Sequence, residues 1–360
     1  MKFFMPVTVY QEEECVIHHA KEIGSLGKRA LIVTGRHSAK KNGSQADVEA
    51  ALAKNGILFD LFDEIEENPS VETVMKAVKA GREAGDDFVI GIGGGSPMDA
   101  AKAIGMLIRH TDYTWEDLYR ADADCSSVPL VLIPTTCGTG SEVTGASVLT
   151  RHDKKTKMSL PHKIFADLAL LDGKYLAAAP ESVLRNTAVD ALGHMYESWI
   201  NGNATEFSRM FVREGLRVWK QTKEVLLGKK KPEREDFDRM LLASCYAGMA
   251  IAHTGTAIPH GLSYILTYDL HMPHGAAIGY FQEGYLREAD EKDRETLLAL
   301  SGFRDLSELH DFYEAVCGKW EIPDSVMIRT YEAIASQEKR LAVPTFFCDR
   351  EVLHRIAFGK

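Results

Sequence analysis

Short apolar runs alternate with longer amphipathic stretches through the first half of the chain. Four such apolar runs lie at residues 29–34, 57–62, 87–92 and 128–133. Longer segments at 44–54, 70–84 and 100–109 have helical character. Strands that alternate with helices form βαβ units and a mostly parallel sheet. The first half is therefore predicted to be an α/β domain with a parallel, Rossmann-like sheet.

The pattern changes near Pro180, where runs typical of strands nearly vanish. Long helical segments follow at 181–201, 205–226, 233–254 and 256–270. The 360 residues suffice for two domains. We therefore expect an α/β domain over 1–178 and an all-α domain over 179–360.

Three consecutive glycines and a serine, Gly93-Gly94-Gly95-Ser96, follow the third predicted strand. Glycines let a diphosphate approach the backbone, and a helix N-terminus favours its negative charge. A tight turn alone needs fewer glycines, so phosphate binding is the favoured interpretation. The Thr/Ser-rich loop at 135–144 follows the next strand. It is either a second cofactor contact or an ordinary turn.

One carboxylate and three imidazoles in the second half form a candidate metal site. Asp190 and His194 are four residues apart, so they share one face of a helix. The neighbours in that helix are apolar, and an unpaired carboxylate there would be costly. His260 and His274 are each flanked by proline and glycine. Each residue has a structural explanation by itself, but the set together favours a divalent cation.

Such a cation acts as a Lewis acid toward an alcohol or carbonyl oxygen, while a nicotinamide carries the hydride. Residues 1–178 are therefore the expected dinucleotide-binding domain, and residues 179–360 are the expected metal-binding domain. His253 and His271 lie in the same part of the sequence and could line the site.

Composition excludes several other classes of protein. The net charge of −10 argues against general nucleic-acid binding. The six cysteines are scattered without a Cys-x-x-Cys pair, which argues against a disulfide framework or a thiolate zinc site. The start of the chain lacks the apolar core of a secretory signal, and no membrane span is expected. These features fit a reducing cytoplasm.

The motifs at residues 93–102, 134–144, 190–194 and 273–275 resemble those of the iron-containing (group III) alcohol dehydrogenases. The similarity extends over nearly the whole chain. It implies a dehydroquinate-synthase-like fold and NAD(P)-dependent alcohol oxidation or aldehyde reduction. It also implies a homodimer or larger homo-oligomer, with Fe²⁺ as the metal, although Zn²⁺ suits the same ligands.

The resemblance assigns roles to individual residues. The metal ligands fall on Asp190, His194, His260 and His274, and the catalytic group comprises His260, Tyr264 and His274. The expected cofactor contacts are Gly94, Gly95 and Ser96 at the diphosphate, Asp99 near the nicotinamide ribose, Thr135, Thr136, Thr139 and Thr144 along the cofactor, Lys157 near its ribose, and Asn68 on the adenosine side.

Three departures from the family pattern concern specificity. NAD-preferring members commonly carry an acidic residue where this chain has Gly35, and cations and Ser38 follow it. This predicts NADP rather than NAD. A small residue followed by cations accepts the 2′-phosphate of NADP and offers no carboxylate to the adenosine ribose of NAD. Tyr264 stands where many members have a further histidine. The segment 252–256 also differs, so the resemblance does not define the substrate.

Three alternatives remain beside an alcohol dehydrogenase or aldehyde reductase. One is a glycerol-dehydrogenase-like zinc enzyme that acts on polyols. A second is a dehydroquinate-synthase-type lyase, which would need a Lys/Arg cluster that is not evident near the metal motifs. The third is an inactive relative that serves as a binding protein, against which the complete ligand set argues.

Overall fold

The computed structural model describes residues 2–154 and 156–359. By internal contacts the chain divides into two compact units. The α/β unit comprises Met5–Thr136 and Gly140–Ala179. The helical unit begins at Pro180 and also includes Cys137–Thr139 and the start of the chain up to Phe4.

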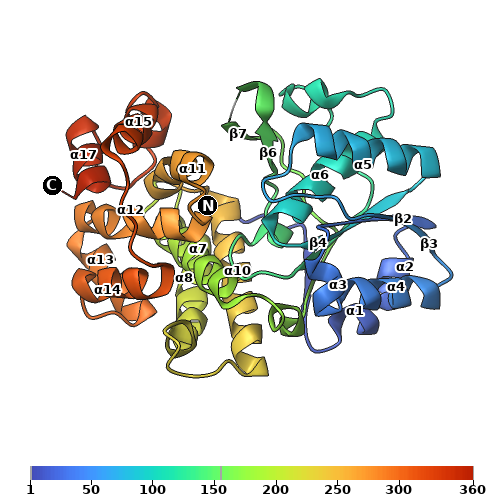
Figure 1. Ribbon diagram of the computed structural model, residues 1–360, viewed down its shortest axis with the longest axis horizontal. Helices are drawn as coiled ribbons and strands as arrows, with labels where there is room; N and C mark the ends of the chain where they lie inside the picture. Colours follow the sequence, from blue (N-terminus) through green and yellow to red (C-terminus); the bar gives the residue numbers. More distant parts are fainter. Residues whose placement is uncertain (1, 155, 360) are drawn as a thin grey trace. The chain divides into compact units, whose positions relative to one another are not determined.

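A six-stranded sheet in the order β1-β8-β5-β4-β2-β3 forms the centre of the α/β unit, and all its pairings are parallel. Its strands (Figure 1) are β1 (Thr8–Gln11), β2 (Arg29–Thr34), β3 (Leu58–Phe62), β4 (Phe88–Gly93), β5 (Leu130–Pro134) and β8 (Leu168–Leu171). An antiparallel hairpin, β6 (Val148–Arg151) and β7 (Thr156–Ser159), lies outside this sheet. The parallel sheet confirms the predicted fold class.

The four predicted strands correspond to β2, β3, β4 and β5. The sequence interpretation missed β1 and β8, which pair with each other at one side of the sheet. Both have only four residues, which is too short for a clear period, and pairing with neighbouring strands stabilises them.

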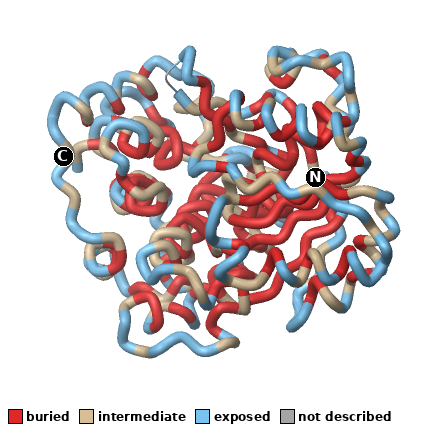
Figure 2. Tube along the Cα trace, turned by 45° about the vertical axis from the view of Figure 1, so that its right-hand side comes forward, coloured by how far each residue is buried: buried red, intermediate tan, exposed pale blue. Residues whose placement is uncertain are grey.

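Helices of the α/β unit include α1 (Cys15–His18), α2 (Ala20–Gly24), α3 (Ser38–Asn42), α4 (Ser44–Lys54), α5 (Val71–Ala84) and α6 (Gly95–Arg109). Apolar side chains of the helices and central strands form a buried core. Figure 2 colours the buried residues red along the Cα trace. Helix α6 starts at Gly95, five residues before the predicted start. Ser96 and Asp99 therefore lie inside the first turns of this helix.

The second unit is built from helices, as predicted. They include α7 (Glu181–Trp199), α8 (Glu206–Trp219), α9 (Lys223–Leu226), α10 (Arg234–Thr254), α11 (Ile258–Leu270), α12 (His274–Glu288), α13 (Glu291–Ser301), α14 (Leu306–Cys317), α15 (Asp324–Ala335), α16 (Glu338–Leu341) and α17 (Arg350–Phe358). Within the described residues, no single helix is long and apolar enough to cross a bilayer. Only α10 and α11 together reach that length and apolarity, and the chain bends by 111° between them.

Candidate metal centre and nucleotide loop

Helix α7 presents a carboxylate and an imidazole one turn apart. Asp190 and His194 are both buried. Asp190 Oδ1 lies 3.7 Å from His194 Nε2. The spacing of four residues therefore places both groups on one face, as the sequence predicts.

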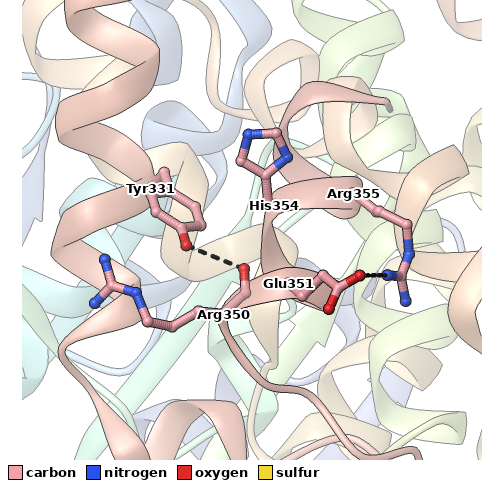
Figure 3. Close-up of a pocket in the computed structure, with 5 residues that line it drawn as sticks. All are labelled: Tyr331, Arg350, Glu351, His354 and Arg355. Atoms are coloured by element: carbon pink, nitrogen blue, oxygen red, sulfur yellow. Dashed lines mark hydrogen bonds and ion pairs between the residues drawn. The ribbon is translucent and has the colours of Figure 1, made fainter.

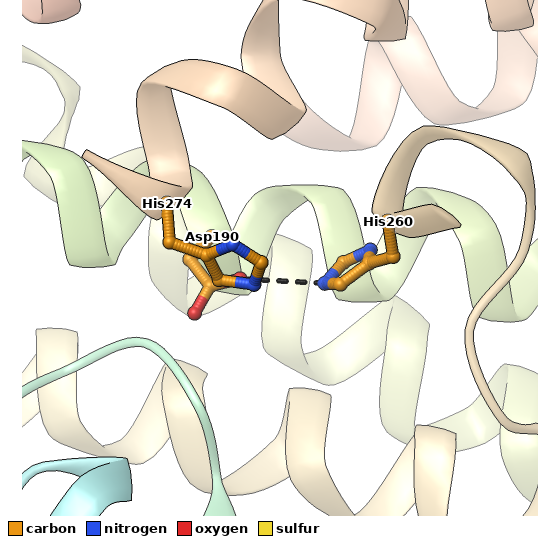
Figure 4. A group of neighbouring side chains, drawn as sticks. All are labelled: Asp190, His260 and His274. Atoms are coloured by element: carbon orange, nitrogen blue, oxygen red, sulfur yellow. Dashed lines mark ion pairs between the residues drawn. The ribbon is translucent and has the colours of Figure 1, made fainter. Parts of the chain in front are cut away.

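His260 from α11 and His274 from α12 come to the same carboxylate (Figure 4). His260 Nε2 lies 3.4 Å from Asp190 Oδ1. One ligand atom from each of Asp190, His260 and His274 lies within 4.8 Å of the other two. The ring of His194 stacks on that of His260 with centroids 4.4 Å apart. All four predicted ligands are therefore neighbours. The ligand atoms of Asp190, His260 and His274 converge within 4.8 Å, and His194 lies beside this group of three.

Two glycines bring α7 and α12 close enough for this arrangement. A β-carbon at Gly275, next to His274, would lie 1.8 Å from the carbonyl oxygen of Asn186. A β-carbon at Gly193 would lie 2.7 Å from Ile278 Cγ2. Real side chains do not tolerate such contacts, so the small residues permit the close packing that delivers His274 to Asp190.

Each histidine has a protein group next to its Nδ1 atom. His194 Nδ1 lies 3.1 Å from the carbonyl oxygen of Gly138. His260 Nδ1 lies 2.5 Å from Glu197 Oε1, and His274 Nδ1 lies 3.5 Å from Ser263 Oγ. A carbonyl or carboxylate partner places the proton on Nδ1. In His194 and His260, Nε2 is then the basic nitrogen toward Asp190, which is the form that binds metals.

At Asp190 and His260, neighbouring charges and burial shift the pKa in opposite directions. Burial alone would raise the pKa of Asp190, but His194, His260 and His274 hold it far below its usual range. Burial likewise disfavours a charged His260, yet Glu197 and Asp190 raise its pKa to about 9. For His194, burial is the stronger influence and lowers the pKa. The site thus favours an ionised carboxylate and attracts positive charge.

Two buried atoms at the centre lack a hydrogen-bond partner. Asp190 Oδ1 and His260 Nε2 face each other as an ion pair, but neither makes a hydrogen bond to any group in the described parts of the chain. An unsatisfied buried polar atom costs about 1–3 kcal/mol. A divalent cation would satisfy both atoms at once, because a carboxylate oxygen and an imidazole nitrogen are among its preferred ligands. The residues present therefore fit the expected metal.

Tyr264 lies one turn beyond His260, against the edge of the cluster. Its ring is nearly parallel to that of His274, with centroids 6.3 Å apart. Burial raises the pKa of the Tyr264 hydroxyl, and the neighbouring guanidinium of Arg340 opposes this rise. Nη1 of Arg340 also donates to the carbonyl oxygen of Ala257, 2.9 Å away, at the start of α11. Tyr264 is therefore held where it can line a site beside the ligands.

The sequence interpretation missed two residues at this site, Glu197 and Arg340. Glu197 had a visible signal, since it is an acidic residue in an apolar helix, seven positions after Asp190. Arg340 had none, because its contact with α11 spans more than eighty residues of sequence.

In the α/β unit, predicted cofactor residues gather at the carboxyl ends of adjacent strands. Gly35 follows β2, Gly94 and Gly95 follow β4, and Thr135 and Thr136 follow β5. The chain order reverses between β2 and β4, because β3 lies on one side of β2 and β4 on the other. Ligands of open parallel sheets bind at such a switch point. The glycine loop is thus at the position that suits a dinucleotide.

The loop holding Asn68 is tied to this position. The backbone N–H of Asn68 donates to Ser96 Oγ at 3.0 Å, and its carbonyl accepts from Thr150 Oγ1 at 2.7 Å. Asn68 also has a left-handed backbone, with φ of 59°. Asn68 and Ser96, two predicted cofactor residues, therefore lie side by side.

Asp99 serves a second purpose besides its predicted ribose contact. Its side chain accepts hydrogen bonds from Ser141 Oγ at 2.6 Å and from the N–H of Val148 at 2.9 Å. The fully buried Lys102 donates to Ser141 Oγ and to the carbonyl oxygen of Ala146, each at 2.7 Å. This network ties the 141–148 loop to α6.

The loop after β2 is less cationic than the sequence indicates. Lys40 Nζ lies 2.6 Å from the carboxylate of Asp63, which follows β3. Lys40, and to a lesser degree Arg36, lowers the pKa of Asp63. The sequence does not reveal this contact, because the pairing of β2 with β3 brings Asp63 near Lys40. Ser38 begins α3 in the same loop.

The remaining predicted cofactor residues are distributed over other segments. Thr144 is buried after a short 3₁₀ turn, and Lys157 lies on β7 opposite Thr150. Thr139 belongs to the segment that packs with the helical unit. Their contacts with a nucleotide stay predictions. His253, which the sequence suggested could line the site, stacks on Phe3 with ring centroids 5.4 Å apart.

A separate surface hollow of about 500 Å³ lies between α15 and α17 (Figure 3). Tyr331 donates to the carbonyl oxygen of Arg350, while Arg355 pairs with Glu351 and Glu288. The arginines here are already neutralised by carboxylates, since Arg350 also pairs with Glu332. None of the lining residues belongs to the metal cluster.

Comparison with known proteins gives relatives over almost all of the sequence. An NADPH-dependent butanol dehydrogenase of Clostridium saccharobutylicum is 31% identical over 77% of this chain and 71% of its own. A long-chain-alcohol dehydrogenase of Geobacillus thermodenitrificans is 29% identical over 94% of this chain and 92% of its own. A sulfoacetaldehyde reductase of Bilophila wadsworthia is 32% identical over 72% of this chain and 67% of its own.

Solved structures agree with these sequences. An iron-containing alcohol dehydrogenase superposes with a TM-score of 0.90 at 35% identity, covering 99% of both chains. Another, from Thermotoga maritima, gives 0.90 at 34% identity and covers 100% of this chain and 99% of its own. The family "Iron-containing alcohol dehydrogenase" matches residues 6–173, and its C-terminal counterpart matches 185–315. With its parallel sheet and its Asp/His cluster, the chain therefore belongs to the iron-containing alcohol dehydrogenase family.

Proposed function

We propose that Asp190, His194, His260 and His274 hold a catalytic Fe²⁺, or Zn²⁺ where that metal is supplied, in an NADP-linked alcohol dehydrogenase or aldehyde reductase. The observation that carries the proposal is the buried pair Asp190 Oδ1 and His260 Nε2, 3.4 Å apart and without hydrogen-bond partners among the described residues. When bound, the cation supplies Lewis acidity toward the substrate oxygen and the nicotinamide supplies hydride chemistry.

The chain's own groups set the conditions for this reaction. Asp190 contributes the negative charge, and the Nδ1 partners of the imidazoles hold the rings in place. Burial keeps Tyr264 protonated at neutral pH, since it raises the pKa of the hydroxyl. Tyr264 is thus available as a hydrogen-bond donor beside His274, in the position where many members have a histidine.

His260→Ala tests the ligand assignment. We expect the purified variant to lose metal when dialysed beside the wild type, and to lose NADPH oxidation with short aldehydes. His253→Ala is the matched control, because this histidine is in the same unit and packs on Phe3. Full metal content and activity in His260→Ala would show that the ligand set is wrong.

A preference for NADP rests on the residue at the end of β2. Gly35 offers no carboxylate to the ribose, and Arg36 follows it. Lys40 forms an ion pair with Asp63. Arg36 and Lys41 are therefore the cations that we propose to bind a 2′-phosphate. The NADPH dependence named for the butanol dehydrogenase relative agrees with this choice.

Gly35→Asp is expected to shift the ratio of kcat/KM for the two cofactors toward NAD. A β-carbon here would lie 3.1 Å from the carbonyl oxygen of Ile65, so the backbone must yield slightly. Gly35→Ala introduces the same β-carbon without the charge and separates the two effects. An unchanged ratio in Gly35→Asp, relative to Gly35→Ala, would refute the NADP assignment.

Oxidoreduction is favoured over the alternatives. Three relatives are named for butanol, long-chain alcohols and sulfoacetaldehyde, and all three reactions interconvert an alcohol with a carbonyl. A polyol oxidoreductase of the glycerol-dehydrogenase kind is the second candidate, since Asp/His ligands also suit Zn²⁺. A panel of alcohols, polyols and aldehydes with both cofactors would distinguish them, and turnover of glycerol above all others would favour the second.

We also propose two functional domains, residues 1–178 and 179–360, in a cytoplasmic homodimer. The division between Ala179 and Pro180 supports the first point. The cysteines among the described residues form no disulfide, which suits a reducing compartment. The edge strand β3 exposes Leu58, Phe59 and Leu61, an apolar surface that association of two copies could cover. Sedimentation of wild type and Leu58→Lys tests the assembly, and a wild-type monomer would refute it.

A further inference from the structure

Glu197 is a fully buried carboxylate outside the predicted ligand set. Its residue exposure is 0%. It follows Asp190 by seven residues and His194 by three, so the three side chains form a stripe along one face of α7. A buried charge without partners would be strongly destabilising. The contacts of Glu197 therefore need an explanation.

Three donors converge on this carboxylate. The backbone N–H of Ala257 donates to Oε2 at 2.6 Å, and Gln282 Nε2 donates to Oε1 at 3.1 Å. His260 Nδ1 lies 2.5 Å from the same Oε1. An ionised carboxylate only accepts hydrogen bonds, so it suits three donors and requires the His260 proton to be on Nδ1.

We propose that Glu197 is the positioning residue of the metal centre, and that it fixes His260 with Nε2 free to bind the cation. Ala257 is the N-cap residue of α11, three positions before His260. Glu197 thus holds both the start of the helix and the ring that the helix carries. This inference rests on the proposed metal role of His260.

Charge balance gives an independent reason for an anion here. The Nδ1 partners of His194 and His274 are a neutral carbonyl and a neutral hydroxyl. Among the proposed ligands only Asp190 is anionic, so a divalent cation would leave one positive charge buried. Glu197, joined to the site through His260, makes the sum neutral and raises the basicity of the imidazole.

Glu197→Gln removes the charge with little change of shape. In the wild type the donors approach both carboxylate oxygens of Glu197. The amide of glutamine has only one acceptor oxygen, so it cannot accept from both sides. If its NH₂ faces His260, the imidazole proton must move to Nε2, which then cannot bind metal. If its oxygen faces His260, the N–H of Ala257 loses its acceptor. Either arrangement weakens the placement of the Nε2 lone pair.

The test measures metal affinity of the metal-free protein by competition between Zn²⁺ and a chelating dye. We expect Glu197→Gln to bind Zn²⁺ about 10–100-fold more weakly than wild type, the usual cost of losing such a partner. Asp236→Asn is the matched control, because Asp236 is a buried carboxylate of the same unit that accepts from Lys230 and the Glu233 N–H. It should lose stability but keep its Zn²⁺ affinity.

A second readout separates positioning from general support of the fold. In Zn²⁺-loaded protein with ¹⁵N-labelled histidine, wild type should show a strongly hydrogen-bonded Nδ1–H for His260. This signal should move or vanish in Glu197→Gln and persist in Asp236→Asn. If Glu197→Gln does not fold, Gln282→Met replaces it. This change removes one of the three donors to Glu197 and leaves its charge in place, and a loss of at least about threefold in affinity is expected.

The outcomes distinguish this inference from the proposed function. If His260→Ala loses Zn²⁺ affinity while the Glu197 variant keeps it within about twofold and retains the Nδ1–H signal, the positioning role is wrong and the ligand set stands. If His260→Ala binds as wild type does, the ligand assignment fails, and the role of Glu197 fails with it.

Discussion

Gly275 packs directly against the backbone of Asn186, so closely that a β-carbon would lie 1.8 Å from the Asn186 carbonyl oxygen. This contact joins the first turn of α12 to α7, one turn before Asp190. His274 is the residue next to Gly275, and its position relative to Asp190 therefore depends on this contact.

Gly275→Ala is expected to destabilise the protein by about 3 kcal/mol or more, because the methyl group cannot be accommodated without moving α12. It should also weaken Zn²⁺ binding. Urea denaturation and metal titration check both effects. Gly105→Ala in α6 is the control, since the nearest atom to its β-carbon would be Ser127 Cβ at an ordinary 3.4 Å. Equal stability of the two variants would contradict the packing argument.

Lys102→Met should destabilise the α/β unit by about 2–4 kcal/mol, because a buried network loses its central cation. Burial lowers the pKa of Lys102, while Asp99 and Glu142 oppose this shift. The loss of the ammonium leaves Ala146 O without this donor and Asp99 without its cation. Lys79→Met, at an exposed helix position, should remain within about 0.5 kcal/mol of wild type. Equal unfolding midpoints would refute the prediction.

The stability of the α/β unit should fall between about pH 4 and pH 7 through Asp86. Burial and the nearby Asp60 raise the pKa of Asp86 to about 7, despite Arg29. The unfolded value is about 3.9. A raised folded pKa favours the protonated form, so this contribution is complete below about pH 4 and is lost as pH rises through 7.

Asp86→Asn should remove this pH dependence and stabilise the protein at pH 8 by about 1–3 kcal/mol. Urea unfolding at about pH 5 and pH 8 measures the difference. Asp122→Asn, at an exposed position, should change neither value. A wild-type slope that persists in Asp86→Asn would assign the titration to another group.

Metal should stabilise the native protein, because the ligands converge only after folding. At a free Zn²⁺ concentration about 100 times Kd, we expect about 2.7 kcal/mol of added stability and a higher Tm. Asp190→Asn should lose most of this increment, since it removes the anionic ligand. Thermal unfolding of metal-free and reloaded protein measures it, and an identical gain in the variant would count against the site.

Sequence reasoning predicted the parallel sheet and the position of the glycine loop because these depend on local properties. A β-branched run that ends in three glycines specifies a strand, a turn and a helix N-terminus within about ten residues. Asp190 and His194 were predictable as neighbours for the same reason, since helical spacing alone places them on one face.

Only the tertiary structure determined which distant residues contact these local elements. His274 reaches Asp190 because Gly193 and Gly275 let α7 and α12 pack closely, and no periodicity encodes that distance. Lys40 is neutralised because strand pairing brings Asp63 beside it. The candidate ligands were therefore evident in the sequence, because helical spacing and residue chemistry are local. Long-range packing determined their convergence on one carboxylate and the three donors that hold Glu197.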